Sequence, residues 1–167
     1  MLQKMINVTE RVVTPLNFVS GKFASLLLFG MMILTFSDVA GRFLVRPIQG
    51  THELTYLGLA VMVFLSLGYT QQKKGHISVG VIIDNLPARG QAIINVLSYL
   101  LMLIILTLML WQTYEYAIRG MNTVTGDLEL PVYIFVLICV VGILIFLLTV
   151  LLDLLKSLQK VVKQDES

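Results

Sequence analysis

The chain has 167 residues, of which 57% are hydrophobic and only 13% are charged. Four long apolar segments fill most of it and leave no stretch for a soluble domain, so residues 1–167 are read as a single membrane domain. Basic residues flank these segments and do not form a basic arm, which excludes nucleic acid as a partner and favours membrane phospholipids.

Residues 1–17 precede the first apolar segment and have their own pattern. Charged side chains alternate with apolar ones at close to helical spacing, the apolar ones being Leu2, Met5, Ile6, Val12, Val13 and Leu16. This spacing predicts an amphipathic helix that lies on the membrane interface. We expect Pro15 to end or bend it, because proline lacks the backbone N–H that a helix interior uses.

The four apolar segments predict transmembrane helices at about 20–44, 53–72, 91–118 and 130–155. The third contains about 25 consecutive uncharged residues and the fourth about 23, each enough to cross a hydrocarbon core of roughly 30 Å. The first spans only if Asp38 is tolerated near its end. The predicted fold class is an all-α integral membrane protein with four transmembrane helices.

The distribution of basic residues predicts the orientation. Nine of the 12 Lys and Arg residues fall in the N-terminal region, the second loop and the C-terminal tail, against three in the first and third loops. By the positive-inside rule both termini are cytoplasmic. Trp111, Tyr114 and Tyr116 gather at the outer end of the third span, where aromatic side chains typically form an interfacial belt.

Few residues offer chemistry. The two histidines, His52 and His76, are predicted on opposite membrane faces and cannot share a haem or a metal ion. Cys139 is the only cysteine, and we expect it to be packed among apolar side chains. The chain has no nucleotide-binding glycine motif. It is therefore predicted to be neither an enzyme nor a holder of a cofactor or metal.

The polar residues near the outer end allow two interpretations. Asp38 lies one helical turn before Arg42, a spacing that favours a structural ion pair, with a proton or ion relay as the alternative. Glu53 begins the second span, where two interpretations are again open: it forms a local bridge to Arg42 or Arg46 across the first loop, or it simply marks the end of a membrane span. Glu115 and Arg119 repeat the four-residue spacing.

Several short motifs, in their order along the four spans, resemble a known family. They are Asp38-Val39-Ala40-Gly41-Arg42-Phe43, Glu53, Gly68, Gly75-His76-Ile77-Ser78-Val79, Leu86-Pro87 and Leu130-Pro131. Over residues 20 to 153 the chain resembles the small (Q-type) membrane subunit of TRAP transporters, the tripartite ATP-independent periplasmic systems.

The resemblance implies a division of labour. A large membrane subunit moves an organic acid, of the sialic-acid or C4-dicarboxylate type, with a sodium gradient, and a periplasmic binding protein delivers it. The small subunit is a scaffold in the bacterial inner membrane, without a cofactor of its own. The principal alternative is a small homo-oligomeric channel or exporter that uses Asp38; a cytochrome-type subunit and a purely structural membrane protein are more distant ones.

Two groups of residues are predicted to contact partners. The outer group meets the large subunit or the binding protein, or else stabilises the chain itself, and consists of Asp38, Arg42, Arg46, Glu53, Asp127 and Glu129. The cytoplasmic group contacts lipid headgroups or the large subunit and consists of Lys73, Lys74 and His76. Small residues that let helices approach closely include Ala24, Gly30, Gly58, Gly68 and Gly142.

Overall fold

The computed structural model describes residues 2–44, 46–73 and 88–165. These residues form four α-helices, and they include no β-strand: α1 (Leu2–Leu44), α2 (Thr51–Gln72), α4 (Ala88–Arg119) and α5 (Val132–Asp165). The all-helical prediction is confirmed, and each helix has a segment long and apolar enough to cross a membrane. Helices α2 and α4 agree with the predicted spans to within three residues at each end, whereas α1 begins well before its predicted span, at Leu2, and α5 extends beyond its predicted span to Asp165.

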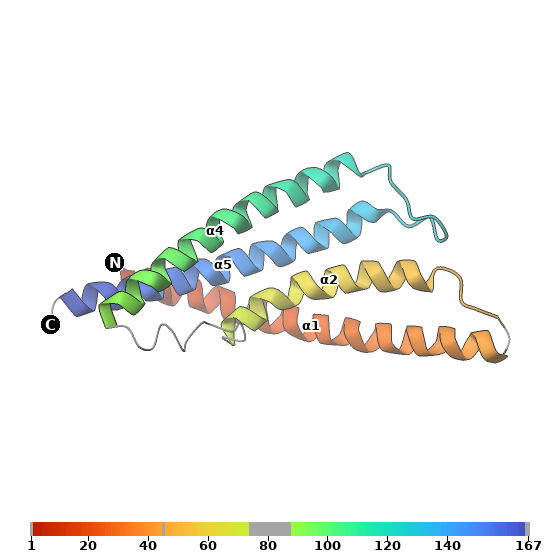
Figure 1. Cartoon of the computed structure of the whole chain (residues 1–167), viewed down its shortest axis with the longest axis horizontal. Helices are drawn as coiled ribbons and strands as arrows, with labels where there is room; N and C mark the ends of the chain where they lie inside the picture. Colours follow the sequence, from red (N-terminus) through yellow and green to blue (C-terminus); the bar gives the residue numbers. More distant parts are fainter. Residues whose placement is uncertain (1, 45, 74–87, 166–167) are drawn as a thin grey trace.

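The helices run alternately in opposite directions, so both termini lie at one end of the molecule (Figure 1). We call this the terminal end. The opposite end carries the first loop, between α1 and α2, and the third loop, between α4 and α5. We call it the loop end, and it includes residues 38–53 and 120–131.

Helix α1 continues through Pro15 to Leu44, so the helix does not end there, the first of the two outcomes expected for this proline. The residues around the proline are held by tertiary packing on α5. Ile6 and Val13 are buried in a cluster with Leu152, and Asn17 hydrogen-bonds to Thr149. Such contacts offset the one backbone hydrogen bond that proline removes. The N-terminal segment is thus the first part of α1, and its place on the membrane interface stays a prediction.

The helices form an open row more than a closed bundle. Contacts join α4 to α5, α5 to α2, and α2 to α1, and the first part of α1 also reaches α5 (Figure 1). One core cluster joins α1, α2 and α5 through Ala24, Val61, Leu65 and Cys139. Another lies between α4 and α5 and is built around Leu106, Ile143, Phe146 and Val150. Cys139 is only 5% exposed, which confirms the expected packed thiol.

Helices α2 and α5 approach each other closely at Gly142. A Cβ atom added there would lie 2.7 Å from the carbonyl carbon and oxygen of Phe64 and 3.0 Å from the amide nitrogen of Leu65. These are backbone atoms of α2, so no side-chain movement makes room for them. The small residue therefore sets the distance between the two helices, as small residues do in membrane proteins.

Buried polar contacts hold the helices together toward the terminal end. The Asn17 amide donates to the Thr149 hydroxyl at 2.9 Å, and both residues are at most 1% exposed. The Thr149 hydroxyl also hydrogen-bonds to the Ile145 carbonyl at 2.8 Å. Gln71 donates to Asp153 at 2.8 Å, and this bond joins α2 to α5. The Asn17–Thr149 pair was not anticipated, because the sequence pattern assigned Asn17 to the end of an interfacial segment.

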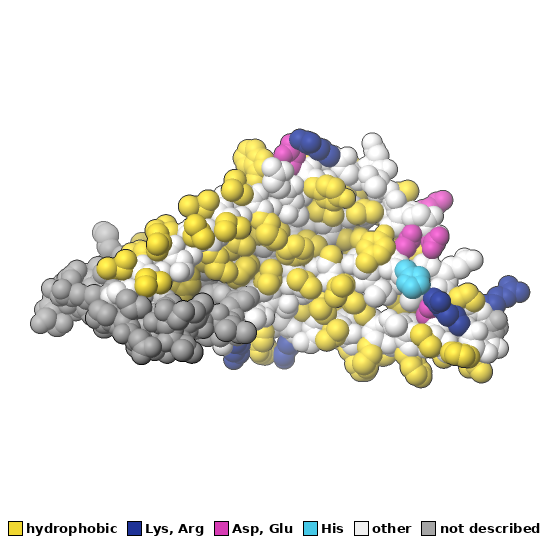
Figure 2. Space-filling view, in the orientation of Figure 1, with side chains coloured by type: hydrophobic (Ala, Val, Ile, Leu, Met, Phe, Trp, Pro, Cys, Tyr) yellow, Lys and Arg dark blue, Asp and Glu magenta, His cyan; other side chains and the backbone are white. Residues whose placement is uncertain are grey.

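Most side chains on the membrane-crossing segments of α1 and α4 stay exposed. Only 11% of the apolar window in α1 and 6% of that in α4 are buried within the molecule. Figure 2 shows the result as hydrophobic side chains along the helices, with charged groups gathered toward the loop end. The chain thus has the surface of a multi-pass membrane protein whose apolar faces need lipid or another protein to cover them.

Candidate functional site: the polar loop end

Asp38 and Arg42 form the predicted pair on the last turns of α1. Two nitrogens of the Arg42 guanidinium donate to one Asp38 oxygen, Nε at 2.9 Å and Nη2 at 2.7 Å. The other Asp38 oxygen accepts the backbone N–H of Ile48 at 2.8 Å. Asp38 is 3% exposed, so both oxygens are used within the chain. The carboxylate joins the end of α1 to the first loop.

Arg42 continues this network to the start of α2. Its Nη2 lies 3.2 Å from Nε2 of His52, an exposed residue on the first turn of α2. An arginine only donates hydrogen bonds, so this contact requires an unprotonated Nε2 on His52. The Asp38–Arg42–His52 chain therefore connects α1 and α2 at the loop end.

Glu53 has a different partner from the one expected. Its Oε1 accepts the backbone N–H of Asp127 at 2.7 Å, and its Oε2 accepts that of Leu128 at 3.1 Å. Within the described residues no ion pair joins Glu53 to Arg42 or Arg46, so the predicted local bridge is wrong. The reason is geometric, because the third loop turns two consecutive amides toward the start of α2 and Arg42 is already engaged by Asp38.

Two glycines at the loop end leave no room for a side chain, Gly50 between the first and third loops and Gly41 between α1 and the first loop. Gly50 has φ of 74°, and a Cβ atom there would lie 2.3 Å from Cγ of Leu128. A Cβ atom at Gly41 would lie 2.7 Å from the carbonyl oxygen of Arg46. Gly41, in the Asp-Val-Ala-Gly-Arg motif, thus lets the first loop fold back onto α1.

The third loop is held in a defined shape. Two hydrogen bonds join Thr125 and Leu130. The Leu130 amide donates to the Thr125 hydroxyl at 3.0 Å, and the Thr125 amide donates to the Leu130 carbonyl at 3.0 Å. An isolated antiparallel bridge joins Val124 and Pro131. Between them, Glu129 has φ of 51°, which is uncommon for a residue other than glycine. The loop is a compact hairpin-like connection anchored to α2 by Glu53.

The predicted outer residues therefore divide into two sets. Asp38, Arg42 and Glu53 are used in contacts within the chain, whereas Arg46, Asp127 and Glu129 have exposed side chains. The exposed set offers one positive and two negative side chains on loops that the buried carboxylates of Asp38 and Glu53 hold in place. Among the described residues, no group of three or more His, Cys, Asp or Glu side chains is placed to hold a metal ion.

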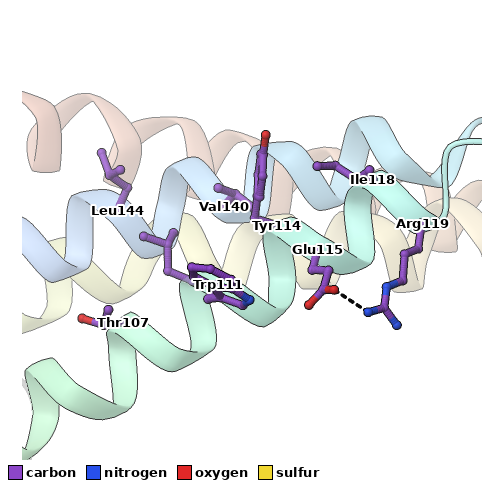
Figure 3. Close-up of a pocket in the computed structure, with 9 residues that line it drawn as sticks. Thr107, Trp111, Tyr114, Glu115, Ile118, Arg119, Val140 and Leu144 are labelled. Atoms are coloured by element: carbon purple, nitrogen blue, oxygen red, sulfur yellow. Dashed lines mark hydrogen bonds and ion pairs between the residues drawn. The ribbon is translucent and has the colours of Figure 1, made fainter.

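A second feature near this end is an apolar groove of about 750 Å³ between α4 and α5. Figure 3 shows Trp111, Tyr114 and Ile118 from α4 and Val140 from α5 along it. The Glu115–Arg119 ion pair forms as its spacing predicted. The rings of Trp111, Tyr114 and Tyr116 are more than half exposed, as expected of an interfacial belt.

The predicted cytoplasmic residues lie at the other end. Lys73 is exposed directly after α2, with its Nζ 5.8 Å from the centre of the Tyr69 ring. Lys74 and His76 lie outside the described residues. Of the cytoplasmic group, the structure thus places Lys73 at the end of the helices opposite to the outer group.

Comparisons with known proteins agree with this architecture. Residues 31–160 match the model of the family described as tripartite ATP-independent periplasmic transporters, DctQ component. No curated protein and no solved structure matches the chain. The match covers most of the chain, including the Asp38–Arg42 pair, Glu53 and the third loop. The chain therefore belongs to the DctQ family, and it is a small membrane component of a TRAP transporter.

Proposed function

We propose that this chain is the non-catalytic scaffold of its transporter. In this proposal it packs against a large, sodium-coupled membrane subunit that imports an organic acid, of the sialic-acid or C4-dicarboxylate type, delivered by a periplasmic binding protein. It lies in the bacterial inner membrane with both termini in the cytoplasm, as the distribution of Lys and Arg predicts.

The observation that carries the proposal is the amount of unpartnered apolar surface on an open row of helices. On α1, Phe23 and Ile33 are each 49% exposed, and a Cβ atom at Gly30 between them would meet nothing within 4 Å. A small residue flanked by exposed apolar ones lets the backbone of a partner helix approach closely. We assign this face of α1 to the large subunit.

The loop end supports a second contact. The buried carboxylates of Asp38 and Glu53 fix the loops, which leaves Arg46, Asp127 and Glu129 to meet the periplasmic binding protein or the large subunit. Both Asp38 oxygens are already used, which speaks against the alternative in which this residue lines a pore. Rigid loops limit the entropy lost when a partner binds.

The test is purification of the C-terminally tagged chain from its native membrane in a mild detergent, with mass spectrometry of what copurifies. We expect one large multi-spanning membrane protein in fixed ratio, and Gly30→Phe should reduce its recovery by occupying the α1 face. A clean homo-oligomer without such a protein would reject the scaffold and favour the channel.

The loop contact is tested separately by charge reversal. Combining Arg46→Glu, Asp127→Lys and Glu129→Lys should lower organic-acid uptake while the chain still copurifies with its partner. The triple variant raises the net charge by two, so the matched control is Glu115→Lys alone, which raises the net charge by the same amount at the exposed pair on α4. Normal uptake by the triple variant would remove these side chains from the proposal.

A further inference from the structure

A groove of about 600 Å³ lies between α1 and α2 toward the terminal end. Its walls are apolar and aromatic, and include Phe18, Leu26, Phe29 and Tyr69. Tyr69 lies directly on the backbone of α1, because a Cβ atom added at Gly21 would be 2.8 Å from Cγ of its ring. Phe18, Leu26 and Phe29 are all at least 49% exposed, so the groove opens to the surroundings of the helices.

Lys22 lines this groove, and Lys73 lies beside one of its lining residues, Tyr69. The Lys22 ammonium lies 4.4 Å from the centre of the Phe18 ring, and the Lys73 ammonium lies 5.8 Å from the centre of the Tyr69 ring. Both rings line the groove. Among the described residues no carboxylate lies within ion-pair distance of either lysine. The groove thus combines an apolar path with two positive charges.

The length of the groove and its charges favour one kind of occupant. From Phe18 to Phe29 the rise of α1 is about 16 Å, close to half of a hydrocarbon core of roughly 30 Å. The groove therefore has the length of an acyl chain in one leaflet. The positive charge of Lys22, which lines it, favours an anionic headgroup at its end.

We propose that this groove binds one anionic diacyl phospholipid of the leaflet at the terminal end. Its phosphate lies beside Lys22 and Lys73, and an acyl chain follows the apolar wall toward Phe29. A lysine with its stem on an apolar surface and its ammonium directed to the interface is the usual arrangement next to headgroups. The inference rests on this chain alone and does not depend on the scaffold role.

The test is native mass spectrometry of the full chain in mild detergent during titration with phosphatidylglycerol or phosphatidylcholine. We expect one tightly bound phosphatidylglycerol and weaker binding of phosphatidylcholine. Lys22→Gln and Lys73→Gln should each weaken phosphatidylglycerol binding about fivefold, the effect of removing one basic side chain next to an anionic headgroup. The control Arg11→Gln removes the same charge from an exposed position of α1 outside the groove. Equal weakening in this control would overturn the specific site.

The acyl path is tested by filling the groove. Ser25 lines it, so Ser25→Phe should lower the occupancy of both lipids, whereas Val19→Phe, at a 64% exposed position outside it, should not. Protection of Cys139 from thiol reagents checks that both variants are folded. If millimolar glycerol phosphate displaced the bound lipid, the groove would bind a free phosphate compound and not a phospholipid. A photo-reactive side chain at position 26 that crosslinks to a protein in native membranes would point to a protein. Either result would overturn the proposal.

Discussion

Gly142→Ala tests whether the approach of α2 to α5 sets the stability of the helix row. The added methyl group would lie 2.7 Å from backbone atoms of Phe64, whereas carbon atoms in contact are normally 3.5–4.0 Å apart. The helices must therefore separate by about 1 Å, and overpacking of this kind costs about 1–3 kcal/mol. That loss corresponds to a roughly 5-fold to 150-fold shift toward the separated helices.

Cys139 supplies the assay, because it is buried one turn before Gly142 and is the only cysteine of the chain. Its rate of modification by a thiol-reactive dye should rise about fivefold or more in Gly142→Ala. Gly30→Ala is the matched control, since a Cβ atom there meets nothing within 4 Å, and it should leave the rate within about twofold. Equal rates in the two variants would refute the argument that the backbones limit each other at this crossing.

Three further changes test the polar contacts and the loops. Glu53→Gln weakens the hydrogen bonds that the third-loop amides of Asp127 and Leu128 donate to the carboxylate, so hydrogen exchange of these amides, measured by mass spectrometry, should become faster. The reactivity of Cys139 toward thiol reagents should stay unchanged. Gly50→Ala should destabilise the loop end by about 1–2 kcal/mol because of the positive φ at this position, and further because its methyl group clashes with Leu128. In a thermal unfolding assay, adding Leu128→Ala to this variant should recover only the loss that is due to the clash. Thr149→Val should cost about 1 kcal/mol, and combining it with Asn17→Ala should cost less than the sum, because either change breaks the same hydrogen bond.

The helices themselves were predictable, because runs of uncharged apolar residues long enough to cross a bilayer leave little choice of secondary structure. Spacing also predicted the contacts within one helix, such as Asp38 with Arg42 and Glu115 with Arg119. Local patterns determine both features, so no knowledge of the packing was needed.

Contacts between distant segments were not predictable in the same way. The partner of Glu53 is a pair of backbone amides 74 and 75 residues away, and backbone groups leave no trace in the sequence pattern. Local propensity predicts that Pro15 ends or bends a helix. The helix continues through it because Ile6 and Val13 pack on α5, and local propensity does not include such packing. The burial of Asn17 depends on the same packing.

The arrangement of polar groups explains how such a thin row of helices keeps its shape. Apolar contacts between helices give little specificity in lipid, because the lipid tails are equally apolar. Here the α1–α2 pair is joined to the α4–α5 pair by hydrogen bonds at both ends, through Glu53 at the loop end and through Asn17 and Gln71 toward the terminal end. Between them, Gly142 brings the backbones into contact. The broad apolar faces are thereby held at fixed angles, as the proposed scaffold role requires.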